Sequence, residues 1–202
     1  MDRQAHIERI RERIKATTTP VPLSGEQIEA YLDILHIRPV KKRQYLTQPG
    51  FATKEQFYVI KGAFRAFFLD HEGKEQTIQF AIEDWYISDI RSYLTGEPAT
   101  LFVEALEDSV IAALPKKEME ALCDRYPEWQ KIYRLTAEGG FANAQKRMMA
   151  HLQKSAEERY MDFVRDYPDI ERRVPRHALA TYLNMSQEYL SKIRKKQTAP
   201  KN

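Results

Sequence analysis

The feature that most constrains the fold is a block of short β-rich runs between two helical regions. From residue 37 to about residue 114, runs rich in aromatic and β-branched residues alternate with turn signals. Within QFYVIKGAFRAFFLDHEGKEQTIQFA, two runs form a predicted hairpin whose loop carries Asp70 and Gly73. Several short strands at this spacing are typical of a small antiparallel barrel or sandwich of the jelly-roll type. The sequence therefore predicts an α+β protein in which helices flank a β jelly roll.

Helical patterns lie on both sides of the β-rich block. Before it, isoleucines recur at helical spacing over residues 5–16, and Ser24 with Gln27 predicts a capping box for a second helix. After Pro115 the pattern is again helical. We expect three parts, which are the jelly roll with its N-terminal helices over 1–126, a long helix over 127–154 and a helical C-terminal domain over 155–202.

The long helix carries one ambiguous feature. Its predicted apolar face consists of Ile132, Leu135, Met148 and Leu152. The adjacent Gly139 and Gly140 fit a helix interior poorly, at roughly 1 kcal/mol each. Two interpretations follow: the pair breaks or kinks the helix, or it lets a second helix approach closely, as in a dimer seam.

The stretch LATYLNMSQEYLSKIRKK, residues 179–196, predicts two short helices joined by a tight turn. Asn184 is the commonest non-glycine residue able to adopt the left-handed conformation that such a turn needs. Ser186 is suited to cap the second helix. The residues expected to pack inside are Leu179, Ala180, Leu183, Met185, Leu190 and Ile193. This chemistry favours a helix–turn–helix motif over a solvated helix pair that merely closes a domain.

The outward side of the second helix carries residue types that contact base edges and phosphates in a major groove. These candidates for DNA binding are Ser186, Gln187, Glu188, Ser191, Lys192, Arg194 and Lys195. The charge distribution agrees, since the segment from Glu171 to the end carries +6, whereas the whole chain carries +3. A basic end on a slightly acidic body suggests an anionic partner at one place.

Composition argues against several other classes of protein. A single cysteine, Cys123, cannot form a disulfide framework or a cysteine-ligated cluster within one chain. No apolar run is long enough for a membrane span, so we expect a soluble, cytoplasmic protein without a membrane partner. The histidines show no ligand spacing, and no nucleophile elbow or phosphate-binding glycine loop is present. We therefore predict no catalytic residue, no metal site and no enzymatic activity.

The order of these features resembles the bacterial CRP/FNR family of transcription regulators. The resemblance covers nearly all of residues 23–196 and rests on QFYVIKGAFRAFF, the hairpin ending in EGKE, the long helix and the helix–turn–helix. It implies a cyclic-nucleotide-binding-type jelly roll as sensor, a dimerisation helix and a recognition helix on a near-palindromic site. By motif position, the base-contacting residues would be Gln187, Glu188 and Lys192. The implied partners are double-stranded DNA and a second copy of the chain, with RNA polymerase as a further candidate.

The cassette that binds the cyclic phosphate departs from the family pattern. Members that bind cyclic AMP carry a glycine–glutamate pair and, later, an arginine–serine pair. The equivalent positions here are Ser88-Asp89 and Ala99-Thr100, and alanine cannot replace the ion pair of an arginine with phosphate. Arg91 is close in sequence, but we expect it at the surface or in an ion pair. We therefore predict weak or absent cyclic AMP binding and no cofactor, with either an unidentified effector or none.

Two further points leave alternatives open. Members of the family usually continue from the recognition helix into a β-hairpin wing, whereas this sequence continues as KKQTAPKN. Either this basic tail replaces the wing's phosphate contacts or DNA affinity is reduced. Residues that either fill the barrel core or line a pocket are Phe80, Trp85, Tyr86, Ile87, Tyr93, Leu101 and Phe102. The alternative function is a ligand sensor or protein-interaction module that has lost DNA binding.

Overall fold

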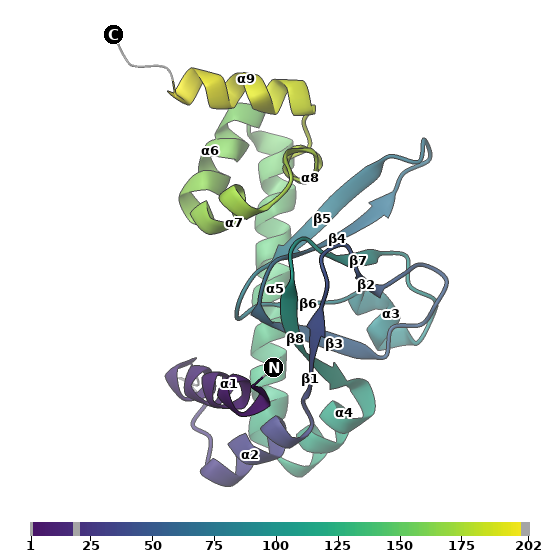
Figure 1. Ribbon diagram of the computed structural model, residues 1–202, viewed down its shortest axis with the longest axis vertical. Helices are drawn as coiled ribbons and strands as arrows, with labels where there is room; N and C mark the ends of the chain where they lie inside the picture. Colours follow the sequence, from purple (N-terminus) through teal and green to yellow (C-terminus); the bar gives the residue numbers. More distant parts are fainter. Residues whose placement is uncertain (1, 18–20, 199–202) are drawn as a thin grey trace.

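The computed structural model describes residues 2–17 and 21–198. A long helix, α5 (Pro127–Gln153), runs along most of the length of the molecule (Figure 1). The β domain lies beside it, with α1 (Arg3–Thr17) and α2 (Gly25–Asp33) toward one end and the C-terminal helices at the other. Residues 199–202, which end the predicted basic tail, lie outside the described residues.

Two antiparallel four-stranded sheets form the β domain, which confirms the jelly-roll prediction. Their strand orders are β1-β8-β3-β6 and β2-β7-β4-β5. The strands are β1 (His36–Val40), β2 (Tyr45–Thr47), β3 (Glu55–Lys61), β4 (Phe64–Leu69), β5 (Glu75–Ala81), β6 (Tyr86–Ile87), β7 (Phe102–Ala105) and β8 (Ser109–Pro115). Phe57, Phe64 and Ile111 belong to the apolar core that the two sheets enclose. The predicted hairpin is confirmed as β4 and β5, with Asp70 and Gly73 in its loop.

Gly62 makes the tight connection between β3 and β4. Its φ of +110° is a conformation that residues with a Cβ rarely adopt. A Cβ at this position would also lie only 2.0 Å from the hydroxyl oxygen of Ser109. The amide of Gly62 donates a 2.7 Å hydrogen bond to Glu83, which places that carboxylate at the edge of the β domain that faces the C-terminal helices.

Helix α5 is continuous through Gly139 and Gly140, so the interpretation that these glycines break the helix is wrong. Apart from the adjacent residues and the backbone of α5 itself, none of the described residues has an atom within 4 Å of a Cβ built on either glycine. Near its start the helix packs inward, where the ring of Trp129 stacks on Tyr31 at 4.3 Å. Farther along, Phe141 and Leu152 are exposed. The predicted apolar face is therefore covered near the start of the helix and uncovered near its end.

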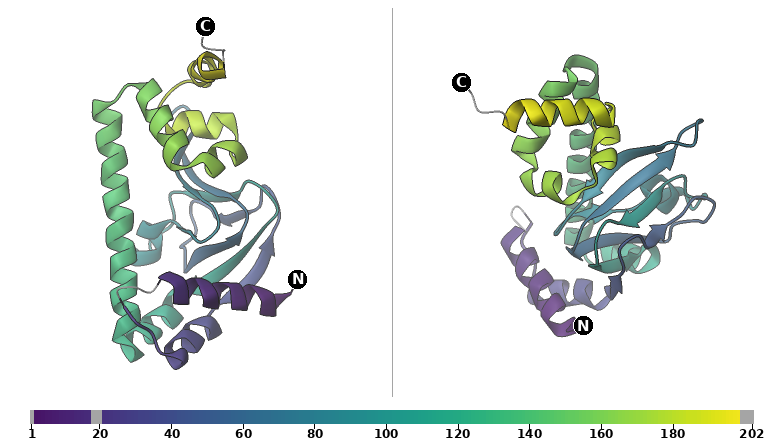
Figure 2. Two further views of the ribbon diagram at one scale, coloured as in Figure 1. Left: turned by 90° about the vertical axis from the view of Figure 1, so that its left-hand side faces the viewer. Right: turned by 45° about the horizontal axis from the view of Figure 1, so that its top comes forward.

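Four short helices follow α5 and form a separate layer. They are α6 (Ala156–Asp166), α7 (Pro168–Arg173), α8 (Arg176–Tyr182) and α9 (Gln187–Thr198). Their shared core includes Phe163, Leu179 and Leu190, and it continues into Phe80 of β5. Figure 2 shows these helices over the end of the sheet that contains β4 and β5. The remaining helices, α3 (Ile90–Thr95) and α4 (Lys116–Arg125), lie in the β domain and directly after it.

Candidate DNA interface and effector cassette

The structure forms the helix–turn–helix that the sequence predicts. Asn184 has a φ of +52°, the left-handed conformation expected at the turn. The Ser186 hydroxyl accepts a 3.1 Å hydrogen bond from the amide of Tyr189 and so caps α9. Leu179, Ala180, Leu183, Leu190 and Ile193 are buried, and Met185 packs at the edge of their cluster. The turn is thus fixed by the residues identified from the sequence.

The exposed side of α9 carries most of the predicted DNA-binding residues. Gln187, Glu188, Lys192 and Lys195 are exposed, and the half-buried Ser191 donates its hydroxyl to the carbonyl of Gln187 at 2.9 Å. Hydrogen bonds from the backbone amide of Glu188 and from Ser186 lower the pKa of the Glu188 carboxyl. This carboxylate is therefore ionised at neutral pH and acts as a hydrogen-bond acceptor at the start of the helix.

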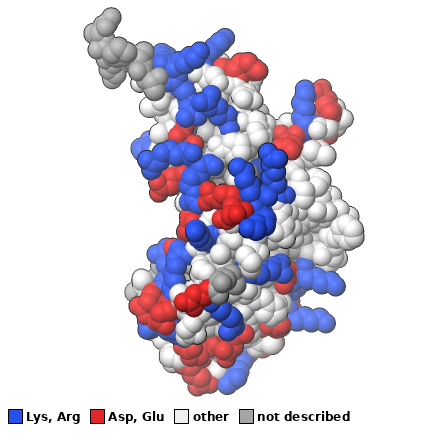
Figure 3. Space-filling view, viewed as in Figure 1, with Lys and Arg blue, Asp and Glu red and all other residues white. Residues whose placement is uncertain are grey.

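Ion pairs fix the two edges of α9 to the rest of the domain. Arg194 pairs with Glu171 at 3.1 Å, and Lys196 pairs with Glu157 at 3.0 Å. Arg194 is half-buried, so it does not point straight outward as the sequence suggested. Figure 3 shows many basic side chains spread over the C-terminal helices, with fewer acidic ones among them, whereas acidic atoms gather near α2 at the opposite end.

The C-terminal helices are attached to the β domain by arginines that the sequence did not single out. Arg173 forms two hydrogen bonds with Glu83, at 2.7 and 3.0 Å, and also contacts Glu107. Burial raises the pKa of Glu83, but the bonds from Arg173 and Gly62 outweigh this effect and lower the pKa to about 2. This contact between domains is therefore charged at neutral pH.

A second polar contact joins α8 to the outer face of the sheet. The buried Arg65 pairs with Glu104 and with Glu75, each at 2.6 Å, and its guanidinium lies over the ring of Phe67. His177, near the start of α8, lies 3.3 Å from the same guanidinium. The first helix of the helix–turn–helix therefore lies directly against the sensor-type sheet.

In the cassette that corresponds to the family's phosphate-binding loop, the Asp89 side chain binds backbone amides of the protein itself. Its carboxylate accepts hydrogen bonds from the amides of Ser92 (3.0 Å), Thr100 (2.8 Å) and Leu101 (3.0 Å). Burial raises the pKa of Asp89, but these amide bonds outweigh it and lower the pKa. The protein's own carboxylate therefore satisfies the amides that a bound anion could otherwise use.

The other predicted cassette residues form no cationic site. Ser88 is buried and donates its hydroxyl to the carbonyl of Glu55 at 3.0 Å. Ala99 is buried, and Thr100 is exposed. Arg91 is exposed and pairs with Glu97, which confirms the expectation of a surface ion pair. The structure thus brings these positions into one loop region but leaves the single arginine among them outside.

A cavity of about 1550 Å³ lies between α5 and the β domain and extends to α6 and α8. Four of the seven residues that the sequence left between core and pocket line it, namely Phe80, Trp85, Tyr86 and Ile87. Tyr93 is buried outside this lining, and Phe102 stacks on Phe67 instead, with ring centroids 5.0 Å apart. Phe80 and Ile87 also belong to the buried core, and Leu101 packs against it, so the core interpretation holds for most of the set.

Within 2–17 and 21–198, no group of three or more His, Cys, Asp and Glu side chains is arranged to hold a metal ion. No helix in the same ranges is both long enough and apolar enough to cross a membrane.

Comparison with known proteins identifies the class of the β domain. Residues 37–126 match the family model of the cyclic nucleotide-binding domain. The transcriptional activator Anr of Pseudomonas protegens is 24% identical over 146 residues, which are 72% of this chain and 59% of Anr. The cAMP-activated regulator CRP of Salmonella typhimurium is 22% identical over 107 residues, which are 53% of this chain and 51% of CRP. The chain thus spans between half and three fifths of these relatives.

Solved structures share the fold over most of the chain. A transcriptional regulator described as a member of the CRP/FNR family, from Eubacterium rectale, superposes with a TM-score of 0.66 at 17% identity, over 87% of this chain and 84% of that one. Together with the order of jelly roll, long helix and helix–turn–helix, these similarities show a fold that joins a cyclic-nucleotide-binding-type β domain to a helical C-terminal part. In sequence and in fold, the chain is similar to transcription regulators of the CRP/FNR family.

Proposed function

We propose that this protein is a DNA-binding transcription regulator that uses α9 as its recognition helix. The observation that carries the proposal is a complete helix–turn–helix with a left-handed Asn184, a capping Ser186 and an exposed polar side on α9. Gln187, Glu188 and Lys192 are the proposed base-contacting residues. Ser186, Ser191 and Lys195 are the proposed contacts to the DNA phosphate backbone. Arg194, through its pair with Glu171, orients the edge of the helix.

We further propose that two copies pair through α5. Leu135, Ala142 and Met149 recur every seven residues along this helix, with Phe141 and Met148 beside them. Phe141 is 71% exposed in the single chain, which is unusual for so large an apolar side chain. Gly139 and Gly140 leave room for a second backbone. In such a dimer, 1–126 forms the sensor domain, 127–154 the dimerisation helix and 155–202 the DNA-binding domain.

The sensor part of the proposal concerns cyclic AMP. A cyclic phosphate needs a cation and free donors, whereas Ala99 offers no charge, Arg91 is engaged outside the loop and Asp89 occupies the amides. We therefore propose that DNA binding does not require cyclic AMP.

The test is a selection from fragmented genomic DNA by the purified, ligand-free protein at near-physiological salt. The proposal expects enrichment of a two-fold-related site whose halves lie about 34–36 Å apart, one turn of B-DNA. Lys192→Ala and Gln187→Ala should each relax base preference at one half-site position, by about 1–3 kcal/mol. Lys131→Ala, on exposed α5 surface away from α9, is the matched control and should leave the preference unchanged. Retention without sequence preference would instead support the sensor or interaction module.

A further inference from the structure

One arginine connects three backbone segments of the C-terminal part. Arg159, on α6, uses all three nitrogens of its guanidinium on carbonyl oxygens. Nη1 donates to Lys154 at 2.6 Å, Nε donates to Leu183 at 2.9 Å and Nη2 donates to Asn184 at 3.0 Å. Within the described residues, no carboxylate forms an ion pair with this guanidinium, so backbone carbonyls are its hydrogen-bond partners.

The three carbonyls belong to residues that set how the helix–turn–helix is oriented relative to α5. Lys154 is the residue at which α5 ends, with extended backbone angles. Leu183 ends α8, and Asn184 is the left-handed residue of the turn that leads into α9. Carbonyls at helix ends have no partner within their helix and must find one elsewhere. Arg159 supplies that partner for both ends at once.

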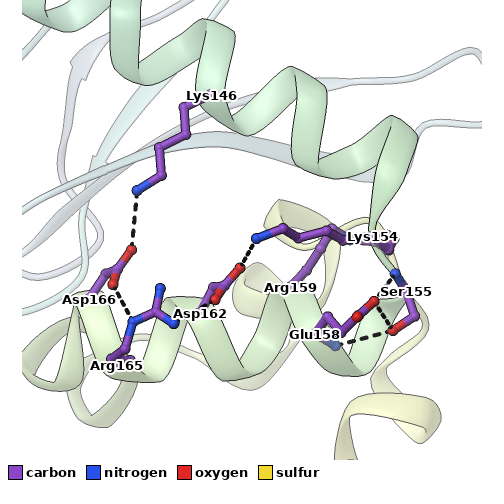
Figure 4. A network of polar contacts seen from close by, with 8 residues as sticks. All are labelled: Lys146, Lys154, Ser155, Glu158, Arg159, Asp162, Arg165 and Asp166. Atoms are coloured by element: carbon purple, nitrogen blue, oxygen red, sulfur yellow. Dashed lines mark hydrogen bonds and ion pairs between the residues drawn. The ribbon is translucent and has the colours of Figure 1, made fainter.

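Helix α6 is itself held to α5 by two ion pairs. Figure 4 shows α5 and α6 side by side, with Lys154 reaching Asp162 and Lys146 reaching Asp166. A capping box between Ser155 and Glu158 fixes the start of α6 directly after Lys154, where α5 ends. Surface ion pairs of this kind contribute little each. Arg159 is half-buried, and its three charge-assisted bonds to carbonyls are therefore the more specific part of the joint.

We propose that Arg159 is a positioning residue for DNA recognition, which fixes the orientation of α9 relative to α5 and thereby the half-site spacing that the dimer accepts. The inference rests on the proposed function, because spacing has meaning only for a dimer on DNA. Arginine suits the position because its planar fork offers donors in several directions at once, whereas a lysine ammonium is a single flexible point charge. Arg159 contacts the backbone of the turn before α9, whereas the proposed base-contacting residues lie on α9 itself.

The first experiment measures the joint without DNA. Spin labels at Lys131→Cys on α5 and Gln197→Cys on α9, in a Cys123→Ser background, report the distance between the two helices; unlabelled protein in excess isolates the distance within one chain. Wild type is expected to give one narrow distribution, and Arg159→Met a broader or shifted one. Arg165→Met is the matched control, because Arg165 lies on the same helix and forms its ion pairs with Asp162 and Asp166 of that helix. It should keep the narrow distribution.

The second experiment measures spacing on the selected DNA site. Half-sites are moved apart or together by one and two base pairs, and binding is compared with that to a single half-site. Arg159→Met should bind the single half-site like wild type, bind the full site about tenfold more weakly, and discriminate less between spacings. Arg159→Lys should rescue little of the discrimination. A role in fold stability alone would weaken all sites equally.

The outcomes distinguish the positioning role of Arg159 from the proposed function in DNA binding. An unchanged distance distribution in Arg159→Met overturns the inference, whatever the DNA result. Unchanged spacing discrimination also overturns it, even if the distribution broadens. If wild type selects no site while the distribution broadens only in Arg159→Met, the proposed function fails and takes the spacing role with it. A broader distribution together with relaxed spacing supports both.

Discussion

The helix–turn–helix and the cassette use the same local device with opposite results. In each, a polar side chain caps the start of a helix: Ser186 caps α9 and Asp89 caps α3. Beyond the cap, Glu188 and Lys192 remain exposed on α9. In the cassette, the second carboxylate oxygen of Asp89 turns back to the amides of Thr100 and Leu101. The helix–turn–helix presents its polar groups outward, whereas the cassette satisfies them internally.

This difference indicates which function each region can still perform. A helix with an exposed polar side can bind an external anion such as DNA, because its donors and charges are available. A loop whose amides already bind a carboxylate gains little from a phosphate, since the new contact must replace an existing one. We therefore expect the stability of the cassette to depend on Asp89 much more than the stability of α9 depends on Ser186.

The largest expected effect follows from removing the cassette carboxylate. Asp89→Ala leaves three backbone amides without their acceptor, and two of them, on Thr100 and Leu101, lie beyond the helix it caps. Each unsatisfied buried donor costs about 1–3 kcal/mol, with some relief from water, so we expect a loss of about 2–4 kcal/mol. Equilibrium urea unfolding measures it.

Asp108→Ala is the matched control for this change. Asp108 also accepts a backbone amide, from Lys42 at 3.0 Å, but its side chain is 67% exposed, so water can replace it. The loss should stay within about 1 kcal/mol. Equal losses in the two variants would mean that the cassette is not held by Asp89 as described.

An intermediate effect is expected where the two regions meet. The pKa of Glu83 is about 2 in the folded protein, below its ordinary value of 4.5, so the folded state holds this proton less tightly than the unfolded state. The stabilisation is complete above pH 4.5 and is lost as the pH falls toward 2. Glu83→Gln should lower stability at neutral pH by about 1–3 kcal/mol and flatten the pH dependence between these values. Chemical denaturation across this range measures both, and a parallel slope in the variant would contradict the assignment.

The helix–turn–helix could be predicted because its determinants are consecutive. Asn184 and Ser186 act on their own backbone or on a neighbour three residues away, and the buried leucines follow helical spacing. The continuity of α5 could not be decided locally, because the cost of Gly139 and Gly140 is small against a helix of 27 residues. The summed helix propensity of the other residues of α5 outweighs the cost of the two glycines.

The functional residues that sequence analysis missed contact partners that cannot be recognised from the sequence. Arg159 binds carbonyl oxygens of residues 183 and 184, and every residue has such an oxygen. Arg173 meets Glu83, ninety positions earlier, only because the C-terminal helices fold back on the sheet. Asp89 was placed in the right loop, but its role depends on amides eleven and twelve residues later. The signal in the sequence was Ala99 in place of the family's arginine, and it suggested a lost phosphate site without showing how Asp89 is used.

The smallest expected effect is that of the cap on α9. Ser186→Ala removes the acceptor for the Tyr189 amide, but this helix end is exposed and water can take its place. We expect a loss of about 1 kcal/mol of stability, and less for Ser186→Asp, which retains an acceptor at the cap. Ser191→Ala is the control, since its hydroxyl only donates to the carbonyl of Gln187 within α9. Urea unfolding measures all three, and a loss for Ser186→Ala as large as that for Asp89→Ala would contradict the contrast between the two regions, because the exposed end would then depend on its cap as strongly as the buried loop does.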